Sequence, residues 1–162
     1  MHGLDVIQRR MRKAIPIMGL NEREVQALHV ESSCRRLRYQ AALEGLESYC
    51  LFIGYPRSGH SLVGAMLDAH PQVAMAHELD VMKFMNAGFD REQIEYLLIE
   101  NARRSAAAGR SWGLFDYRVA GQWQGRFEKL KVLGDKMVPA PRDGSALTLG
   151  NYGRLSNFSK TA

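Results

Sequence analysis

Three groups of residues in this chain could bind an anion or move a proton. The first is the segment 54–61, Gly-Tyr-Pro-Arg-Ser-Gly-His-Ser, which combines glycines, hydroxyls and basic side chains in the manner of an anion-binding loop. The second is His77 with Glu78, either of which is a candidate general base for a hydroxyl group. The third is Asp135 with Lys136. Each group follows a short apolar run, so the elements around them decide whether they meet.

An apolar run precedes the segment 54–61, and an amphipathic one follows it. Residues 49–54 have β propensity and predict a strand, whereas residues 59–70 predict a helix that stops before Pro71. A strand, a tight loop and a helix in this order place backbone N–H groups and the positive end of the helix dipole at one point, where they can hold a phosphate. The alternative is a plain turn between strand and helix, punctuated by proline and glycine.

The spacing Gly54-x4-Gly59-x-Ser61 matches that of a Walker A loop. His60 stands where such a loop has its lysine, which argues against ordinary ATP hydrolysis. The hydroxyl of Ser61 and the backbone N–H groups of the loop would face the anion. The planar guanidinium of Arg57 is suited to phosphate or sulfate oxygens.

The rest of the chain predicts alternating strands and helices. Asn21 with Glu24, and Asp90 with Gln93, have the spacing of helix capping boxes. Beyond the first strand and helix, strands are expected at 73–76 and 131–134, and helices at 21–48, 81–86 and 90–109. This order predicts an α/β fold, P-loop-like and three-layered (α/β/α) around a parallel sheet. In such sheets ligands bind beyond the carboxyl ends of the strands, so the three groups are expected to converge at one edge.

Three parts are expected along the chain. A basic helical segment over residues 1–48 would pack on an α/β core over residues 49–138, and an irregular tail would follow over residues 139–162. The tail is rich in proline, glycine and serine and has little periodicity. The α/β layer structure of this core is expected to be incomplete.

The composition is that of one globular domain. The 162 residues are 46% hydrophobic and 24% charged, and the formal net charge is +5. The positive charge suits an anionic ligand, but it could equally serve solubility. Cys34 and Cys50 show neither CxxC nor zinc spacing, and no segment has the roughly 20 apolar residues of a membrane span. We therefore expect a cytoplasmic protein without a membrane span.

Taken together, these motifs resemble those of the sulfotransferases that use 3′-phosphoadenosine 5′-phosphosulfate (PAPS). The string YPRSGHS after an apolar strand is similar to the 5′-phosphosulfate loop of that family, and HPQVAMAHELD is similar to the stretch that follows it in heparan sulfate-type and bacterial members. GDK at residues 134–136 is similar to a segment of bacterial members. The resemblance covers residues 49 to 137. It implies transfer of a sulfuryl group from PAPS to an acceptor hydroxyl or amine, without a metal.

The resemblance also implies roles for individual residues. Arg57 would stabilise charge on the departing phosphate, and Glu78, or alternatively His77, would be the base. Lys136 and Asp135 would line the acceptor side. The loop residues that would bind the 5′-phosphosulfate are Pro56, Arg57, Ser58, Gly59, His60 and Ser61. The acceptor would be a small molecule or a carbohydrate, and nucleic acid is not expected as a partner.

The chain departs from this family at the 3′-phosphate of PAPS. Family members have a later strand that ends in an arginine, with a serine several residues on. Here the nearest match is Pro141-Arg142-Asp143, which no apolar strand precedes. We therefore expect the N-terminal portion of a sulfotransferase, weakly active or inactive. Two other functions stay open: a P-loop nucleotide-binding protein related to kinases, which would need Mg²⁺, and a non-catalytic nucleotide-binding or interaction module.

Overall fold

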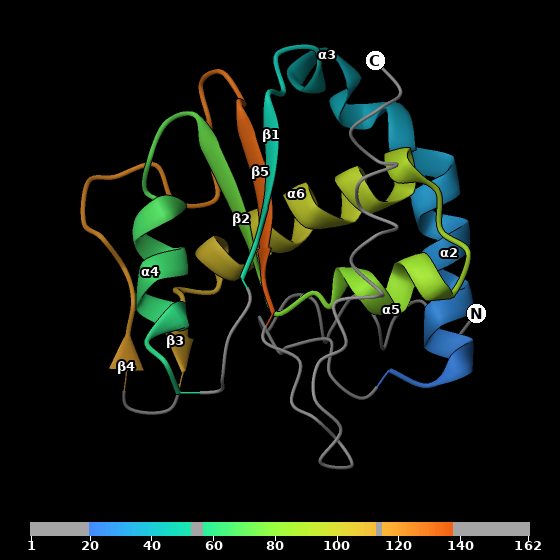
Figure 1. Ribbon diagram of the computed structural model, residues 1–162, viewed down its shortest axis with the longest axis horizontal. Helices are drawn as coiled ribbons and strands as arrows, with labels where there is room; N and C mark the ends of the chain where they lie inside the picture. Colours follow the sequence, from blue (N-terminus) through green and yellow to red (C-terminus); the bar gives the residue numbers. More distant parts are fainter. Residues whose placement is uncertain (1–19, 53–56, 113–114, 138–162) are drawn as a thin grey trace.

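The computed structural model describes residues 20–52, 57–112 and 115–137 (Figure 1). In chain order its elements are α2 (Glu22–Arg35), the 3-10 helix η1 (Arg36–Tyr39), α3 (Gln40–Leu43), β1 (Ser48–Leu51), α4 (His60–Leu67), β2 (Val73–His77), α5 (Val81–Asn86), α6 (Arg91–Ala107), β3 (Ser111–Trp112), β4 (Phe115–Asp116) and β5 (Val132–Lys136). The predicted tail at 139–162 and the first 19 residues of the predicted N-terminal segment lie outside the described residues.

Three parallel strands form the sheet, in the order β1-β5-β2, so that β5 lies between the other two. Their carboxyl ends therefore meet at one edge. At the middle of the sheet, Gly134 of β5 pairs with Cys50 of β1 and with Met75 of β2. A Cβ atom at Gly134 would lie 2.4 Å from the Cys50 carbonyl oxygen and 2.7 Å from the Met75 methyl group, so only glycine fits. The predicted mixed α/β fold with a parallel sheet is confirmed.

Helices lie on both sides of this sheet. Figure 1 shows α4 on one side and α6, with α2 and α5 beyond it, on the other. The main core forms between the sheet and α6, where Ala74, Ala76 and Leu133 of the strands join buried residues of α6 such as Leu97. These strand residues alternate with those that face α4, as expected for a side-chain period of two.

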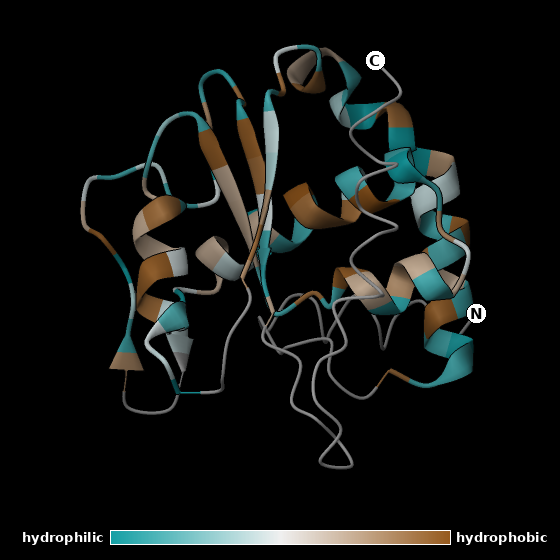
Figure 2. Cartoon of the chain, in the orientation of Figure 1, coloured by the Kyte–Doolittle hydropathy of each residue, from teal (hydrophilic) through white to brown (hydrophobic). Residues whose placement is uncertain are grey.

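The outer side of α4 is apolar and exposed. Leu62, Val63, Met66 and Leu67 have exposed fractions of 54%, 46%, 61% and 37%, and Figure 2 shows brown, hydrophobic residues along this helix. None of the helices among the described residues is long and apolar enough to cross a membrane.

Both predicted capping boxes are confirmed. The Glu24 backbone N–H donates to Asn21 Oδ1 at 3.0 Å, and the Asn21 N–H donates to Glu24 Oε2 at 2.9 Å. Asp90 and Gln93 make the same two hydrogen bonds at 2.8 and 2.9 Å. These reciprocal bonds satisfy N–H groups that have no partner inside the helix, and they fix where α2 and α6 begin.

The predicted helix over residues 21–48 is wrong in its length. The helix α2 ends at Arg35, and the chain continues as the short helices η1 and α3. Tyr39 is the buried hydrophobic residue of this region, and its hydroxyl donates to the Glu100 carboxylate of α6. Its ring also stacks on Tyr96 at 6.1 Å between centroids. The sequence of residues 36–48 did not indicate this single anchor.

The strands β2 and β5 end later than predicted, whereas β1 ends at Leu51, before the predicted end at residue 54. The helix α5 begins and ends at the predicted residues. The strand β2 continues to His77, and β5 continues to Lys136. Because β5 is central, Asp135 pairs with Leu51 and Lys136 pairs with His77, and these pairs extend the ladder past residue 134. Asp135 and Lys136 thus lie inside the strand and not after it.

Candidate functional site

The first turn of α4 lies just beyond the carboxyl edge of the sheet. The helix begins at His60 after Gly59, whose φ of 80° is left-handed and suits glycine. The Gly59 carbonyl accepts the N–H groups of Leu62 and Val63. Within the described residues no side chain caps this end. The positive end of the helix dipole is therefore open to an anion.

The ammonium group of Lys136 lies at this helix end. Its Nζ atom is 3.0 Å from Ser61 Oγ of α4 and 2.7 Å from Glu78 Oε1 beyond β2. The Lys136 side chain is 2% exposed, and its stem crosses Gly64, where an added Cβ would approach Lys136 Cγ to 2.8 Å. Burial lowers the pKa of Lys136, and the Glu78 carboxylate opposes that effect. A buried ammonium needs such partners to be stable.

Residues from all three predicted groups therefore lie together: Ser61 from the loop and helix, Glu78 from the second group, and Lys136 from the third. They come from α4, the end of β2 and the end of β5. The sequence interpretation assigned Lys136 to the acceptor side. Its contact with Ser61 instead places its charge beside the loop.

Glu78 has an unusual backbone conformation. Its φ is 56°, and the φ of Asp80 is 64°, in a region where residues other than glycine are uncommon. Asp80 Oδ1 accepts the Lys83 N–H at 3.3 Å and so caps α5. Arg57, in the loop, has a φ of 64°. Backbone strain of this kind clusters at functional sites, and here three such residues adjoin one sheet edge.

Asp135 points to the face of the sheet opposite to the one that Lys136 faces. Its carboxylate is 1% exposed and accepts the backbone N–H groups of Leu79 and Val81, each at 3.1 Å. Burial raises its pKa to about 7, against the lowering effect of these N–H groups. Neighbouring strand residues face opposite ways, so the structure does not bring Asp135 and Lys136 together on one face. Asp135 instead holds the turn that carries Glu78.

The pKa values of His77 and His60 are both lowered, which favours the neutral forms of their imidazoles. Burial, reinforced by the charge of Lys136, lowers the pKa of His77 to about 4. The same two causes lower the pKa of His60, whose Nδ1 lies 3.3 Å from Ser58 Oγ. An imidazole with a pKa of about 4 is a weak base near pH 7.

Arg57 and Ser58 are exposed at the mouth of the loop. Within the described part of the chain, Arg57 makes no ion pair with a carboxylate. Pro56, also predicted to bind the cofactor, lies outside the described residues, as do Arg142 and the other residues of the weak 3′-phosphate match.

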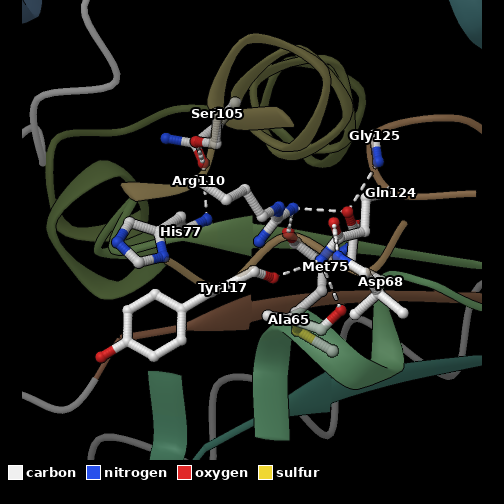
Figure 3. Close-up of polar contacts among 11 residues, drawn as sticks. Ala65, Asp68, Met75, His77, Ser105, Arg110, Tyr117, Gln124 and Gly125 are labelled. Atoms are coloured by element: carbon white, nitrogen blue, oxygen red, sulfur yellow. Dashed lines mark hydrogen bonds and ion pairs between the residues drawn. The ribbon is translucent and has the colours of Figure 1, made fainter. Parts of the chain in front are cut away.

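A buried ion pair behind the site was not predicted. Asp68, at the end of α4, is fully buried and accepts N–H groups from Met75 and Gly125, both at 2.6 Å, and from Arg110 (Figure 3). Burial raises the pKa of Asp68 to about 6, which the Arg110 guanidinium partly offsets. In sequence, Asp68 and Arg110 stand 42 positions apart at helix ends, where charged residues are ordinarily exposed.

Side chains from α4, α6 and the residues after α6 form hydrogen bonds with the backbone of the edge strand β2. Met75 donates its N–H to Asp68, and its carbonyl accepts from Arg110 Nη2 at 3.0 Å. The His77 N–H donates to Asn101 Oδ1 at 2.6 Å. An edge strand whose polar groups are already paired does not recruit another strand. The same hydrogen bonds also fix the end of β2, which Glu78 follows directly.

The site is thus an open helix N-terminus, a buried ammonium and an adjoining carboxylate at the carboxyl edge of a parallel sheet. No set of three or more histidine, cysteine, aspartate or glutamate side chains among the described residues is arranged to hold a metal ion. Comparison of the chain with protein-family models, with curated proteins and with solved structures gave no match.

Proposed function

We propose that this chain binds the phosphosulfate of PAPS at the start of α4 and transfers its sulfuryl group to an acceptor hydroxyl or amine. The observation that carries the proposal is the Lys136 ammonium, held 3.0 Å from Ser61 Oγ at an uncapped helix end. An anion there would meet backbone N–H groups, a hydroxyl and a buried positive charge at once. The sequence resemblance to PAPS-dependent sulfotransferases supports the choice of anion.

Lys136 also supplies the lysine ammonium that the loop at residues 54–61 lacks. His60 stands where a Walker A loop has its lysine, and burial and the charge of Lys136 lower the pKa of its imidazole. Lys136 reaches the same helix turn from the neighbouring strand β5. A lysine ammonium acts on a phosphate group as a point charge. It can therefore come from a neighbouring strand as well as from the loop.

The chain's own residues divide the work of such a transfer. PAPS would supply a sulfuryl group bonded to a good leaving group. Ser61, the first N–H groups of α4 and Lys136 would hold the phosphate, and Arg57 would stabilise the negative charge that develops on it. Glu78 would accept the proton that the acceptor hydroxyl loses as its oxygen bonds to sulfur. Positioning and electrostatics would then provide most of the rate enhancement.

The proposal also covers the layer architecture, the location of the protein and the class of acceptor. Helices on opposite sides of three parallel strands support an incomplete, P-loop-like three-layer architecture. Cys34 and Cys50 are both free thiols, which supports a reducing, cytoplasmic location. We propose a small molecule or a carbohydrate as the acceptor.

A nucleotide kinase is the second candidate. The ammonium of Lys136 favours it, because this charge stands beside a loop with Walker A spacing that otherwise has no lysine. A kinase would bind ATP with Mg²⁺, whereas a sulfotransferase would bind adenosine 3′,5′-bisphosphate (PAP), the product left by PAPS, without any metal.

Calorimetric titration separates these functions. PAP is titrated without Mg²⁺ into the wild-type chain and into Arg57→Ala, and ATP is titrated with Mg²⁺ in parallel. Metal-independent binding of PAP that Arg57→Ala weakens supports the sulfotransferase. Binding of ATP alone supports the kinase, and binding of neither ligand by a folded chain rejects both.

A further inference from the structure

We propose that the ion pair between Lys136 and Glu78 couples anion binding to the availability of the base. In the free protein the Glu78 carboxylate holds the Lys136 ammonium. An anion at the start of α4 takes over this ammonium, and Glu78 becomes free to accept a proton from the acceptor. This inference rests on the proposed function and adds an order to it, in which the donor binds before the acceptor can react.

The contacts of Lys136 give the reason for the competition. Glu78 Oε1 and Ser61 Oγ lie 2.7 and 3.0 Å from the same nitrogen. An anion bound to Ser61 and to that nitrogen would stand next to the Glu78 carboxylate, with a charge of the same sign. Two anions beside one ammonium repel each other in a poorly solvated site. Anion binding and the Lys136–Glu78 pair therefore oppose each other.

The burial of the two partners indicates which one moves. The Lys136 side chain is 2% exposed and the Glu78 side chain 21% exposed. The stem of Lys136 is confined above Gly64, so the ammonium stays in place. Glu78 has solvent on one side, into which its carboxylate can turn.

The backbone around Glu78 stays fixed during such a change. Asp135 accepts the N–H groups of Leu79 and Val81 on either side of Asp80. Glu78 itself has a left-handed φ of 56°. The side chain of Glu78 can therefore exchange partners while its Cα position is kept, which holds the released carboxylate close to the bound anion.

A double-mutant cycle with PAP as the ligand tests this coupling. Calorimetry measures the affinity of the wild-type chain, Glu78→Gln, Lys136→Met and the double variant. Competition predicts that Glu78→Gln binds PAP about tenfold more tightly than wild type, because the ammonium no longer has a carboxylate partner. Lys136→Met should bind at least about tenfold more weakly. With Lys136→Met already present, Glu78→Gln should change the affinity less than about twofold.

Asp80→Asn is the matched control. It removes a negative charge two residues from Glu78, at another left-handed position that asparagine tolerates, and it should change PAP affinity less than about twofold. Thermal unfolding of each variant confirms that it is folded.

The outcomes separate this inference from the proposed function. Unchanged or weaker binding of PAP by Glu78→Gln overturns the coupling and leaves the proposed function standing. If Glu78→Gln increases the affinity for PAP equally with and without Lys136, the coupling is also overturned. Direct repulsion between the Glu78 carboxylate and the bound anion would then explain the increase. Failure of the folded wild-type chain to bind PAP rejects the proposed function and the coupling together.

Discussion

The Lys136 ammonium, on the central strand of the sheet, lies 2.7 Å from the Glu78 carboxylate just past the end of the neighbouring strand. The two residues are 58 positions apart in sequence. Parallel pairing brings them together, because Lys136 is in register with His77, the residue before Glu78. The pair therefore depends on the register of β2 and β5, and on the side chains that position each strand end.

Ser61→Ala should weaken PAP binding about three- to tenfold. The change removes a hydroxyl that contacts Lys136 Nζ and would face the bound phosphate. Ser48→Ala is the control, because Ser48 is exposed and begins β1, at the end of the strand opposite to the site. Calorimetry measures both, and equal effects of the two changes would contradict the assignment of Ser61.

Gly64→Ala should perturb both stability and the site. Its new Cβ would meet Lys136 Cγ at 2.8 Å and Lys136 Cβ at 3.1 Å, close to the backbone where the lysine side chain cannot yield. Overpacking of this kind costs about 1–3 kcal/mol, of which the better helix propensity of alanine returns up to about 1 kcal/mol. Urea unfolding should therefore show a net loss, together with weaker binding of PAP.

Gly45→Ala provides the comparison for this change. An added Cβ at Gly45 would make only ordinary contacts of 3.4 Å or more. If Gly64→Ala were as stable as Gly45→Ala, and bound PAP as wild type does, the close packing of Lys136 on α4 would be disproved.

Asp68→Asn should destabilise the fold by about 3–5 kcal/mol. The change leaves the buried Arg110 guanidinium without its carboxylate, and truncating one partner of a buried ion pair has a cost of this size. Asp116→Asn is the control, because the Asp116–Arg118 pair is exposed and its loss should leave stability unchanged within error. Chemical denaturation measures both, and a small effect at Asp68 would mean that Arg110 finds another partner.

The pH dependence of stability should report the neutral state of His77. Its pKa is lowered to about 4 in the folded chain, and an unfolded histidine titrates near 6.5. Between these values the unfolded chain binds the extra proton, so the contribution of His77 to stability is present above pH 6.5 and is lost as the pH falls toward 4.

His77→Gln removes this contribution. The free energy of unfolding of wild type minus that of His77→Gln should therefore decrease as the pH is lowered from 6.5 to 4. Asp68 and Asp135, whose pKa values are raised, act in the opposite direction, and the difference between the two proteins largely cancels them. A difference that does not vary with pH over this interval would show that His77 titrates normally.

Local signals in the sequence predicted the framework of the fold. Capping boxes located the starts of α2 and α6, because hydrogen bonds between residues three apart depend only on the local chain. The three strand segments followed from short apolar runs. The convergence of Ser61, Glu78 and Lys136 followed from a topological rule, since ligand groups gather at the carboxyl ends of parallel strands.

Features that depend on distant contacts were not predictable. Where β5 ends is decided by its pairing with two neighbours, and this placed Asp135 and Lys136 inside the strand, on opposite faces. The Asp68–Arg110 pair joins two helix ends that no periodicity connects. Beyond the end of α2 at Arg35, Tyr39 packs against α6 and bonds to Glu100, 61 positions away, and a local pattern does not indicate such a contact.

The central claim, that the Lys136 ammonium holds an anion at the start of α4, is tested most directly by PAP titration of Lys136→Met beside Lys131→Met. Lys131 precedes the same strand and pairs with the exposed Glu47 at 2.6 Å, away from α4. We predict metal-independent PAP binding by wild type and by Lys131→Met, and at least about tenfold weaker binding by Lys136→Met. Equal affinities of the two folded variants would contradict the claim.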